Sequence, residues 1–512
     1  MRAPITALLL LVPAAAAAQR AASPSPRGPA SITTADVQRR INIIAADSMR
    51  GRPTPSRELE EVAAYIGGEF QRLKLRPAGD SGRYVQRYPL EVWRFEPDSS
   101  TLRASGRATA SWRLGQDVLL VQGEAPEGQQ TAPVVFVTGN ALAGGALDSA
   151  AVTGKVVVVS FGPQLNAIAG KLLPLSPLAI LLVGDLPDSL WMQFPGREGG
   201  IRVRNPSEGG GLNIPPVFAT RLSTLAPWLV GAGVSLDSLA PWSRAALKAR
   251  PVTDETIQIN VWQRLLERTT APNVVGILEG SDPSLRSEYV VYSAHMDHIG
   301  TPGDGLGCAA QGADSICNGA DDDGSGTVAV LELAEAFATA AARPKRSVVF
   351  MTVSGEERGL WGSAYFTDHP TVPLASVVAD LNTDMVGRNA PDTMAVIGRE
   401  HSDLGTTVDR VAAAHPELRI HPVGDLWPQE GLFFRSDHFN FAKHGVPILF
   451  FTSGLHPDYH RVTDAPAALD ADKVARYARL AYFLGMDVAN SAVRPKWNPE
   501  SYRQIVTGTQ TP

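Results

Sequence analysis

The C-terminal half of the chain alternates short apolar runs with helical patterns, and this alternation constrains the fold more than any other feature. The runs at 289–293, 347–353, 376–381 and 447–451 have the length and β-branched composition of buried strands. The segment 326–342, between the first two of them, places its apolar residues on one helical face. This pattern predicts an α/β fold with a mixed, mostly parallel sheet and helices on both faces.

The region before this alternation has two different characters. Residues 34–49 and the apolar positions within 59–73 predict helices. From about 111 to 262, short β-branched runs are separated by Gly and Pro, which is typical of a mostly β module. We expect that module to be inserted into the main domain. The expected division is a leader at 1–18, a flexible linker at 19–33, the main domain at 34–110 and 263–490, the inserted module at 111–262, and an extended C-terminal tail at 491–512.

The N-terminal residues have the layout of a secretory signal peptide. Arg2 precedes an apolar run at 5–12, and small residues at 14–18 precede Gln19. The alternative is a membrane anchor, but the run is short for a hydrocarbon core of about 30 Å. We therefore expect a mature chain that begins near Gln19, has no stable membrane span and is secreted or periplasmic.

The balance of charge argues against a nucleic-acid partner. The formal net charge is −6, from 46 Lys and Arg against 52 Asp and Glu. Contacts to phosphate need clustered Lys and Arg, and the sequence contains no dense basic run. The oligomeric state stays open.

The chain contains two cysteines, Cys308 and Cys317. A pair nine positions apart can be two free thiols or a disulfide. In an oxidising compartment the bridge is favoured, so we expect a disulfide if the chain is exported.

Acidic or histidine-rich motifs follow the strand-like runs of the C-terminal half. The motifs are Ala-His-Met-Asp-His at 294–298, Asn-Gly-Ala-Asp-Asp-Asp-Gly-Ser-Gly at 318–326, Ser-Gly-Glu-Glu-Arg-Gly at 354–359, Asn-Thr-Asp-Met at 382–385 and Asp-Tyr-His at 458–460. In open α/β sheets, ligands bind beyond the carboxyl ends of the strands. We therefore expect all of these motifs to meet at one edge of the sheet.

The residue types in these motifs suit a pair of zinc ions. Two zinc ions about 3.5–4 Å apart need nitrogen and oxygen ligands and one shared carboxylate. Asp297, two residues after His295, can orient that imidazole through its other ring nitrogen. Glu356 and Glu357 are adjacent, so one carboxylate can face the metal and the other the attacking water, as a general base. Each motif alone is more often a solvated turn or helix cap, but their joint order indicates a metal site.

The ordered motifs resemble the bacterial leucyl aminopeptidase and aminopeptidase Y family of co-catalytic zinc peptidases. The resemblance covers roughly 34–110 and 265–490, and it includes the stretches 49–52 (Met-Arg-Gly-Arg) and 75–79 (Leu-Arg-Pro-Ala-Gly). The run at 152–157 (Val-Thr-Gly-Lys-Val-Val) resembles a protease-associated domain. The implied fold is the zinc exopeptidase fold, and the implied cofactor is two Zn²⁺ ions per chain.

The resemblance implies a role for each ligand. The implied zinc ligands are His295, Asp322, Glu357, Asp384 and His460. His295 and Asp384 would hold one ion, and Asp322 would bridge it to the second. Glu357 and His460 would hold that second ion.

Three more residues receive catalytic roles from the resemblance. Asp297 would orient His295, Glu356 would be the general base, and Tyr459 would stabilise the oxyanion. The chain departs from the family pattern in the loop that contains the two cysteines, which lengthens the connection to Asp322, but no ligand is lost.

The implied function is an exported aminopeptidase that removes N-terminal residues from peptides with a free N-terminus. A carboxypeptidase on the same fold would need a cation for the substrate carboxylate, and Arg388 and Arg435 are candidates. A glutaminyl cyclase would need only one zinc ion, and a receptor-like protein would be expected to lose ligands. The sequence leaves open the preferred first residue and the role of the inserted module.

Overall fold

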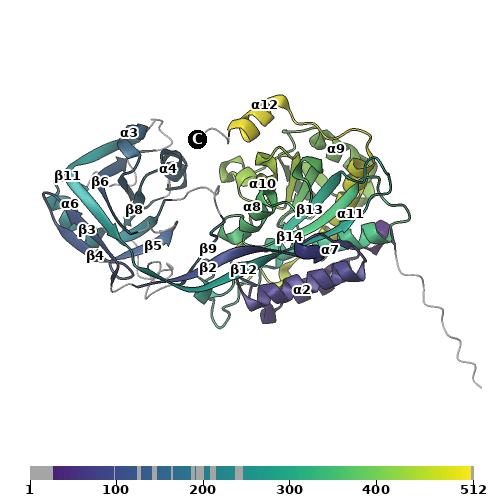
Figure 1. The fold of residues 1–512 in the computed structure, drawn as a ribbon, viewed down its shortest axis with the longest axis horizontal. Coiled ribbons are helices and arrows are strands. Elements are labelled where there is room, and N and C mark those ends of the chain that lie inside the picture. Colours follow the sequence, from purple (N-terminus) through teal and green to yellow (C-terminus); the bar gives the residue numbers. More distant parts are fainter. Residues whose placement is uncertain are drawn as a thin grey trace, which may run out of the picture.

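The computed structural model describes residues 27–96, 99–123, 128–140, 147–162, 165–185, 191, 201–207, 215–236 and 246–508. The expected leader and the expected start at Gln19 lie outside these residues. Figure 1 shows a larger part that contains the C-terminal half and a smaller β-rich part, which the long strands β2 (Val85–Phe95) and β12 (Gln263–Leu278) join.

The larger sheet is mixed, as the alternation predicted. Its central strands β14, β13, β15 and β18 run parallel to one another, whereas β12, β2 and β9 continue the sheet in antiparallel pairs. A short strand, β1 (Arg76–Pro77), also pairs with β12. In spatial order the strands are β17 (His421–Val423), β16 (Thr393–Ile397), β18 (Ile448–Thr452), β15 (Val377–Thr383), β13 (Tyr289–His295), β14 (Ser347–Val353), β12, β2 and β9 (Ile201–Arg204).

Helices cover both faces of the larger sheet because its central strands are apolar on both sides. Along β13, Val290 and Tyr292 join one hydrophobic cluster, whereas Val291 joins the cluster on the opposite face. The first cluster contains residues of α1 (Thr34–Ile44), α2 (Arg57–Arg72), α7 (Gly326–Thr339), α9 (Leu404–Ala414) and α11 (Ala471–Asn490). The second cluster contains residues of α8 (Trp361–Asp368) and α10 (His438–Lys443).

The smaller part is built on a second sheet with its own hydrophobic clusters. In spatial order its strands are β4 (Ala110–Arg113), β3 (Thr101–Ser105), β11 (Lys248–Asn260), β6 (Gln129–Thr138), β7 (Val156–Ser160), β8 (Ala179–Gly184), β10 (Val217–Arg221) and β5 (Val118–Gln122). The expected boundary at 110–111 falls inside β4. Short strands with alternating apolar residues have the same sequence pattern on both sides of a domain boundary, so the pattern does not locate it. The division into domains and the likeness to a protease-associated domain stay predictions.

Two expectations about the chain ends need correction. The described end of the linker expected at 19–33 is packed, because Gly28–Ser31 forms a helical turn and Ile32 is buried against the first hydrophobic cluster. The tail was expected to be extended, but it contains the helix α12 (Pro499–Tyr502). Trp497 anchors this tail by donating from its indole nitrogen to the carbonyl of Gly445. Single apolar residues in a polar segment carry no periodic signal. The sequence pattern therefore did not predict the burial of Ile32 or the contact of Trp497.

Among the described residues, no helix is both long and apolar enough to cross a membrane.

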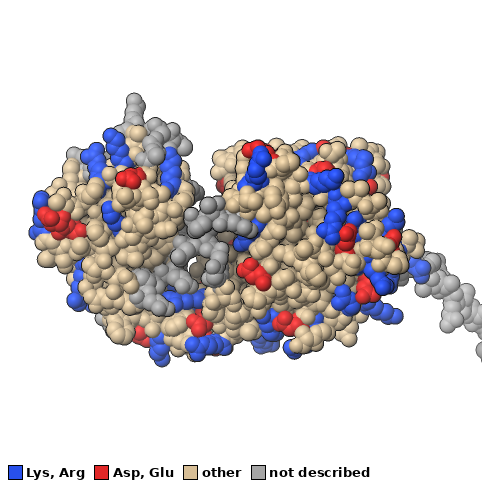
Figure 2. Space-filling model, turned by 45° about the horizontal axis from the view of Figure 1, so that its top comes forward, with Lys and Arg blue, Asp and Glu red and all other residues tan. Residues whose placement is uncertain are grey.

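Figure 2 shows one face of the molecule, on which basic and acidic side chains are interspersed over both parts.

Candidate metal centre

The motifs of the C-terminal half meet at the carboxyl edge of the parallel strands. His295 is the last residue of β13, and Asp384 follows β15 directly. Glu357 lies in a short turn, Glu356–Arg358, shortly after β14. Asp322 lies in the segment Ala320–Ser325, which leads into α7. His460 comes from the loop after β18.

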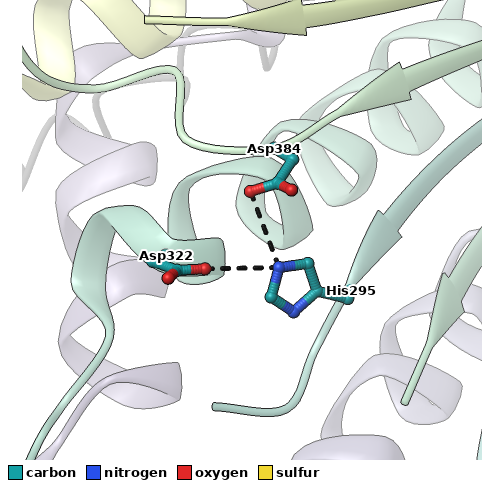
Figure 3. A group of neighbouring side chains, drawn as sticks. All are labelled: His295, Asp322 and Asp384. Atoms are coloured by element: carbon teal, nitrogen blue, oxygen red, sulfur yellow. Dashed lines mark ion pairs between the residues drawn. The ribbon is translucent and has the colours of Figure 1, made fainter. Parts of the chain in front are cut away.

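We call His295, Asp322 and Asp384 the His295 group. The imidazole of His295 points between two carboxylates, as Figure 3 shows. Its Nε2 lies 3.3 Å from Oδ1 of Asp322 and 3.5 Å from Oδ1 of Asp384. All three residues are buried, and their ligand atoms lie within 4.8 Å of one another. One metal ion can therefore be shared by these atoms.

We call Asp322, Glu357 and His460 the His460 group. Nε2 of His460 lies 3.2 Å from Oδ2 of Asp322 and 3.1 Å from Oε2 of Glu357. Asp322 thus presents one oxygen to each group, which is the geometry of a bridging ligand. Burial lowers the pKa of His460, but the charges of Glu357 and Asp322 outweigh it and raise the pKa to about 11. The two carboxylates therefore favour a cation at this point.

The buried polar atoms of the two groups fit metal ions better than hydrogen bonds. Nε2 of His295, Oδ2 of Asp322, Oδ1 of Asp384 and Nε2 of His460 are buried and make no hydrogen bond within the described residues. A buried polar atom without a partner costs about 1–3 kcal/mol, so such atoms rarely persist without a ligand. Imidazole and carboxylate donors at these positions form a set that suits zinc.

The aspartates on either side of Asp322 hold the neighbouring loops in place. The carboxylate of Asp323 accepts the main-chain N–H groups of His295 (3.2 Å) and Met385 (3.1 Å). The carboxylate of Asp321 accepts the main-chain N–H of Gly387 (2.7 Å). The acidic triplet therefore supplies one residue to the centre, while the other two fix the end of β13, which carries His295, and the loop that carries Asp384.

Asp464 fixes the main chain of the triplet from the opposite side. Its buried carboxylate accepts the main-chain N–H of Asp322 at 3.1 Å, and that of Asp321 at the same distance. Sequence analysis gave Asp464 no role because it lies far from the triplet along the chain and outside any motif.

Glu356 faces the His295 group from the turn after β14. Its Oε2 lies 4.0 Å from Nε2 of His295. Burial raises the pKa of Glu356 well above its ordinary value, and the negative charges of Glu357 and Asp384 add to that effect. The turn begins at Gly355, which has φ 73°, and a Cβ there would lie 2.6 Å from the hydroxyl oxygen of Tyr88.

Asp297 makes different contacts from those expected. Nδ1 of His295 lies 3.2 Å from the main-chain oxygen of Asp297 and 3.7 Å from its carboxylate. The carboxylate instead accepts the hydroxyl of Thr54 (2.8 Å) and the main-chain N–H of Glu356 (3.4 Å). Asp297 can therefore orient His295 through its carbonyl group, while its carboxylate holds the turn that carries Glu356.

A pocket opens beside the metal centre. The residues that line it are Asp322, Glu356, Asp384, Met385, Leu432, Arg435, Phe450, Thr452, Gly454, Leu455 and Tyr459. Tyr459 stacks on His460 with ring centroids 3.9 Å apart. Burial and the nearby carboxylates raise the pKa of Tyr459, so its hydroxyl stays protonated and can donate a hydrogen bond into the pocket.

Two further residues support the centre, although sequence analysis gave them no role. Nδ1 of His298 lies 2.7 Å from Oε1 of Glu357, and His298, Asp322 and Glu357 also have ligand atoms within 4.8 Å of one another. The buried guanidinium of Arg52 donates to the main-chain oxygens of Met296 and Gly319, both at 2.7 Å. His298 stands in the quoted motif at 294–298 and Arg52 in the stretch 49–52, but only the folded loops reveal their contacts.

Comparison with known proteins agrees with this site. The family model described as "Peptidase family M28" matches residues 273–484. A "Probable zinc metalloprotease" of Pyricularia oryzae is 30% identical over 390 residues, which cover 66% of this chain and 72% of that protein. A "Probable leucine aminopeptidase" of Arthroderma otae is 26% identical over 235 residues, which cover 44% of this chain and 60% of that protein.

Solved structures share the fold of the chain. An aminopeptidase from Aneurinibacillus sp. superposes with a TM-score of 0.54 at 17% identity, over 91% of this chain and 96% of its own. A zinc aminopeptidase from Bacillus subtilis superposes with a TM-score of 0.50 at 16% identity, over 90% and 97%. The family model and the sequence relatives show that the chain belongs to peptidase family M28 and is a zinc metallopeptidase of the kind that the motifs indicated.

Proposed function

We propose that the chain is an exported aminopeptidase that binds two zinc ions and removes N-terminal residues from peptides. The observation that carries the proposal is the pair of ligand groups that meet at Asp322. Each group presents buried nitrogen and oxygen atoms that make no hydrogen bond within the described residues. The relatives named as aminopeptidases support the choice of an exopeptidase.

The ligands divide between two ions. His295 and Asp384 would hold one ion, His460 and Glu357 would hold the other, and Asp322 would contribute an oxygen to each. When bound, two zinc ions polarise the scissile carbonyl and lower the pKa of the attacking water. The 2.7 Å contact with His298 holds the carboxylate of Glu357 toward the centre, so we assign His298 to support of a ligand.

Glu356 accepts the proton of the attacking water and passes it to the leaving amine. Its carboxylate faces Nε2 of His295 at 4.0 Å, beside the bridging Asp322. A buried carboxylate with a raised pKa suits this task, because a base works best when its pKa is near the working pH. The contact of Asp297 with the Glu356 N–H keeps the turn in position.

Tyr459 stabilises the negative charge that develops on the carbonyl oxygen. Tyr459 lines the pocket together with Asp322 and Glu356, and its hydroxyl stays protonated because its pKa is raised. A positioned donor of this kind strengthens its hydrogen bond as the oxygen gains charge.

Export is the second part of the proposal. A disulfide joins Cys308 and Cys317, as expected. Stable disulfides occur mainly in secreted or periplasmic proteins, so the bridge supports an oxidising compartment.

The experiment that tests the proposal compares free and blocked N-termini. The purified chain, loaded with zinc, should hydrolyse leucyl anilide and free peptides, and it should leave the N-acetylated forms intact. Chelation should abolish the activity, and added zinc should restore it. Release of C-terminal residues from N-acetylated peptides would instead identify a carboxypeptidase and refute the proposal.

A further inference from the structure

The pocket beside the metal centre has apolar side chains in its wall, and one positively charged side chain lies among them. Met385, Leu432, Phe450 and Leu455 supply apolar surface, and the carboxylates of the centre close one side. Arg435 is the one cation among the described residues that line the pocket. Next to these apolar side chains, a guanidinium has to pair with water, with a neighbour or with a ligand.

Most donors of Arg435 have no protein partner. Its Nη1 lies 3.5 Å from the main-chain oxygen of Glu430 and 3.4 Å from Oε2 of the same residue, both at the long limit of a hydrogen bond. In the part of the chain that the structure describes, Nε and Nη2 of Arg435 make no hydrogen bond. The side chain keeps 41% of its surface exposed, so these donors are accessible to a ligand.

Arg388 differs from Arg435 in its ion pair with Asp458, in its exposure and in its position outside the pocket lining. Its Nη2 donates to the carboxylate of Asp458, and its Nη1 faces Asp464 at 3.8 Å. Its side chain is 17% exposed, and it does not belong to the pocket lining. Of the two arginines that the sequence offered for a substrate carboxylate, only Arg435 is placed to meet one.

We propose that Arg435 forms a subsite for a carboxylate on the substrate, in addition to the free amine that the aminopeptidase reaction requires. The inference rests on the proposed function. A guanidinium presents two parallel N–H donors that match a carboxylate, and such pairs are stronger than neutral hydrogen bonds. Glu430 contacts only Nη1, at 3.4 Å, so Nε and Nη2 of Arg435 can face a substrate carboxylate, and an amide in its place should be disfavoured.

The carboxylate can come from two sources. It can be the C-terminus of a dipeptide, or it can be the side chain of an acidic residue. Two substrate pairs separate these sources: Leu-Gly against Leu-Gly amide, and Glu-Gly amide against Gln-Gly amide. At least one pair should favour the carboxylate by about tenfold in kcat/KM, which is the scale of a hydrogen bond to a charged group.

Three variants assign this preference to the guanidinium. In Arg435→Met, the ratio of the two kcat/KM values within the preferred substrate pair should fall to about one. In Arg435→Lys, this ratio should take an intermediate value. Arg410→Met is the matched control, because Arg410 is an exposed arginine that pairs with Asp487 on α11, outside the pocket lining. It removes the same charge and should keep the wild-type ratio. Zinc content, measured on every variant, excludes loss of the metal centre.

The outcomes separate this inference from the proposed function. Hydrolysis of Leu-Gly amide without preference in either pair would overturn the carboxylate subsite and leave the aminopeptidase assignment intact. Absence of hydrolysis of every free-amine substrate would overturn the proposed function itself. An equal loss of the ratio in Arg410→Met would show that net charge, and not a subsite, sets the preference.

Discussion

The two ligand groups of the metal centre share Asp322 but differ in how the chain holds them. The side chain of His295 is 1% exposed, and its main-chain N–H donates to Asp323. The side chain of His460 is 31% exposed, and its residue has a left-handed backbone with φ 57°. An exposed loop opens locally at a lower cost in free energy than the end of a central strand does. A metal ligand on such a loop therefore moves away from the ion more easily. The comparison therefore teaches that the two metal ions should differ in how readily they leave.

The largest effect should come from removing the residue that the two groups share. Asp322→Ala should reduce metal binding at both groups, and activity should fall by more than the loss of the general base alone would cause. Metal analysis of the purified variant measures both sites. Asp314→Ala, which changes an exposed acid in the preceding loop, should keep two ions and full activity. Loss of only one ion in Asp322→Ala would refute the bridge.

The next largest effect should come from Glu356, which lies beside the His295 group without being assigned to it. Glu356→Gln keeps size and hydrogen bonding but cannot accept a proton. We expect kcat to fall by about two to four powers of ten while metal content persists. Glu357→Gln is the matched variant, and it should lose metal from the His460 group together with activity. A near-normal kcat in Glu356→Gln would contradict its role as the base.

A smaller effect should mark His298 as the support of the His460 group. His298→Ala removes the 2.7 Å contact to Glu357. It should lower the affinity of the His460 group for zinc by about 10- to 100-fold. At saturating zinc, the variant should still bind two ions. His415→Ala, which changes a histidine that stacks on Phe483, should have no effect on zinc. If His298→Ala bound one ion at every zinc concentration, His298 would be a ligand.

The smallest effect on the site should come from the disulfide. Cys308, Cys317 and Val462 belong to one hydrophobic cluster, and Val462 is two residues from His460. Changing both cysteines to Ser should lower the free energy of unfolding by about 2–3 kcal/mol, as the loop model predicts. Zinc in the His460 group should exchange faster, whereas zinc in the His295 group should not. If zinc exchange became equally faster in both groups, the proposed difference between the His295 group and the His460 group would be wrong.

Sequence pattern predicted those parts of the molecule in which periodicity and chemistry coincide. The strand at 347–353 and the motifs that follow the central strands lie where expected, because buried parallel strands are continuously apolar. The pairing of β9 with β2 was not predicted, since a short edge strand such as Ile201–Arg204 alternates too briefly to indicate its partner.

Sequence pattern found the residues that face the centre more readily than those that hold them. His295 and its partners have metal-ligand chemistry and occur in order at strand ends and before a helix, so they are recognisable together, although each motif alone is more often a solvated turn or helix cap. Arg52 and Asp464 act through main-chain groups of other loops, and those contacts exist only after the loops have folded. His298 and Glu357 are separated by 59 positions in the sequence, so no local pattern connects them.

The most direct test of the account is a stepwise zinc titration of the metal-free chain. Native mass spectrometry counts the bound ions, while hydrolysis of leucyl anilide is followed on the same samples. We predict that two ions bind in sequence, with the His295 group filling first, and that activity rises with the second ion. Full activity with one tightly bound ion would contradict the two-zinc centre.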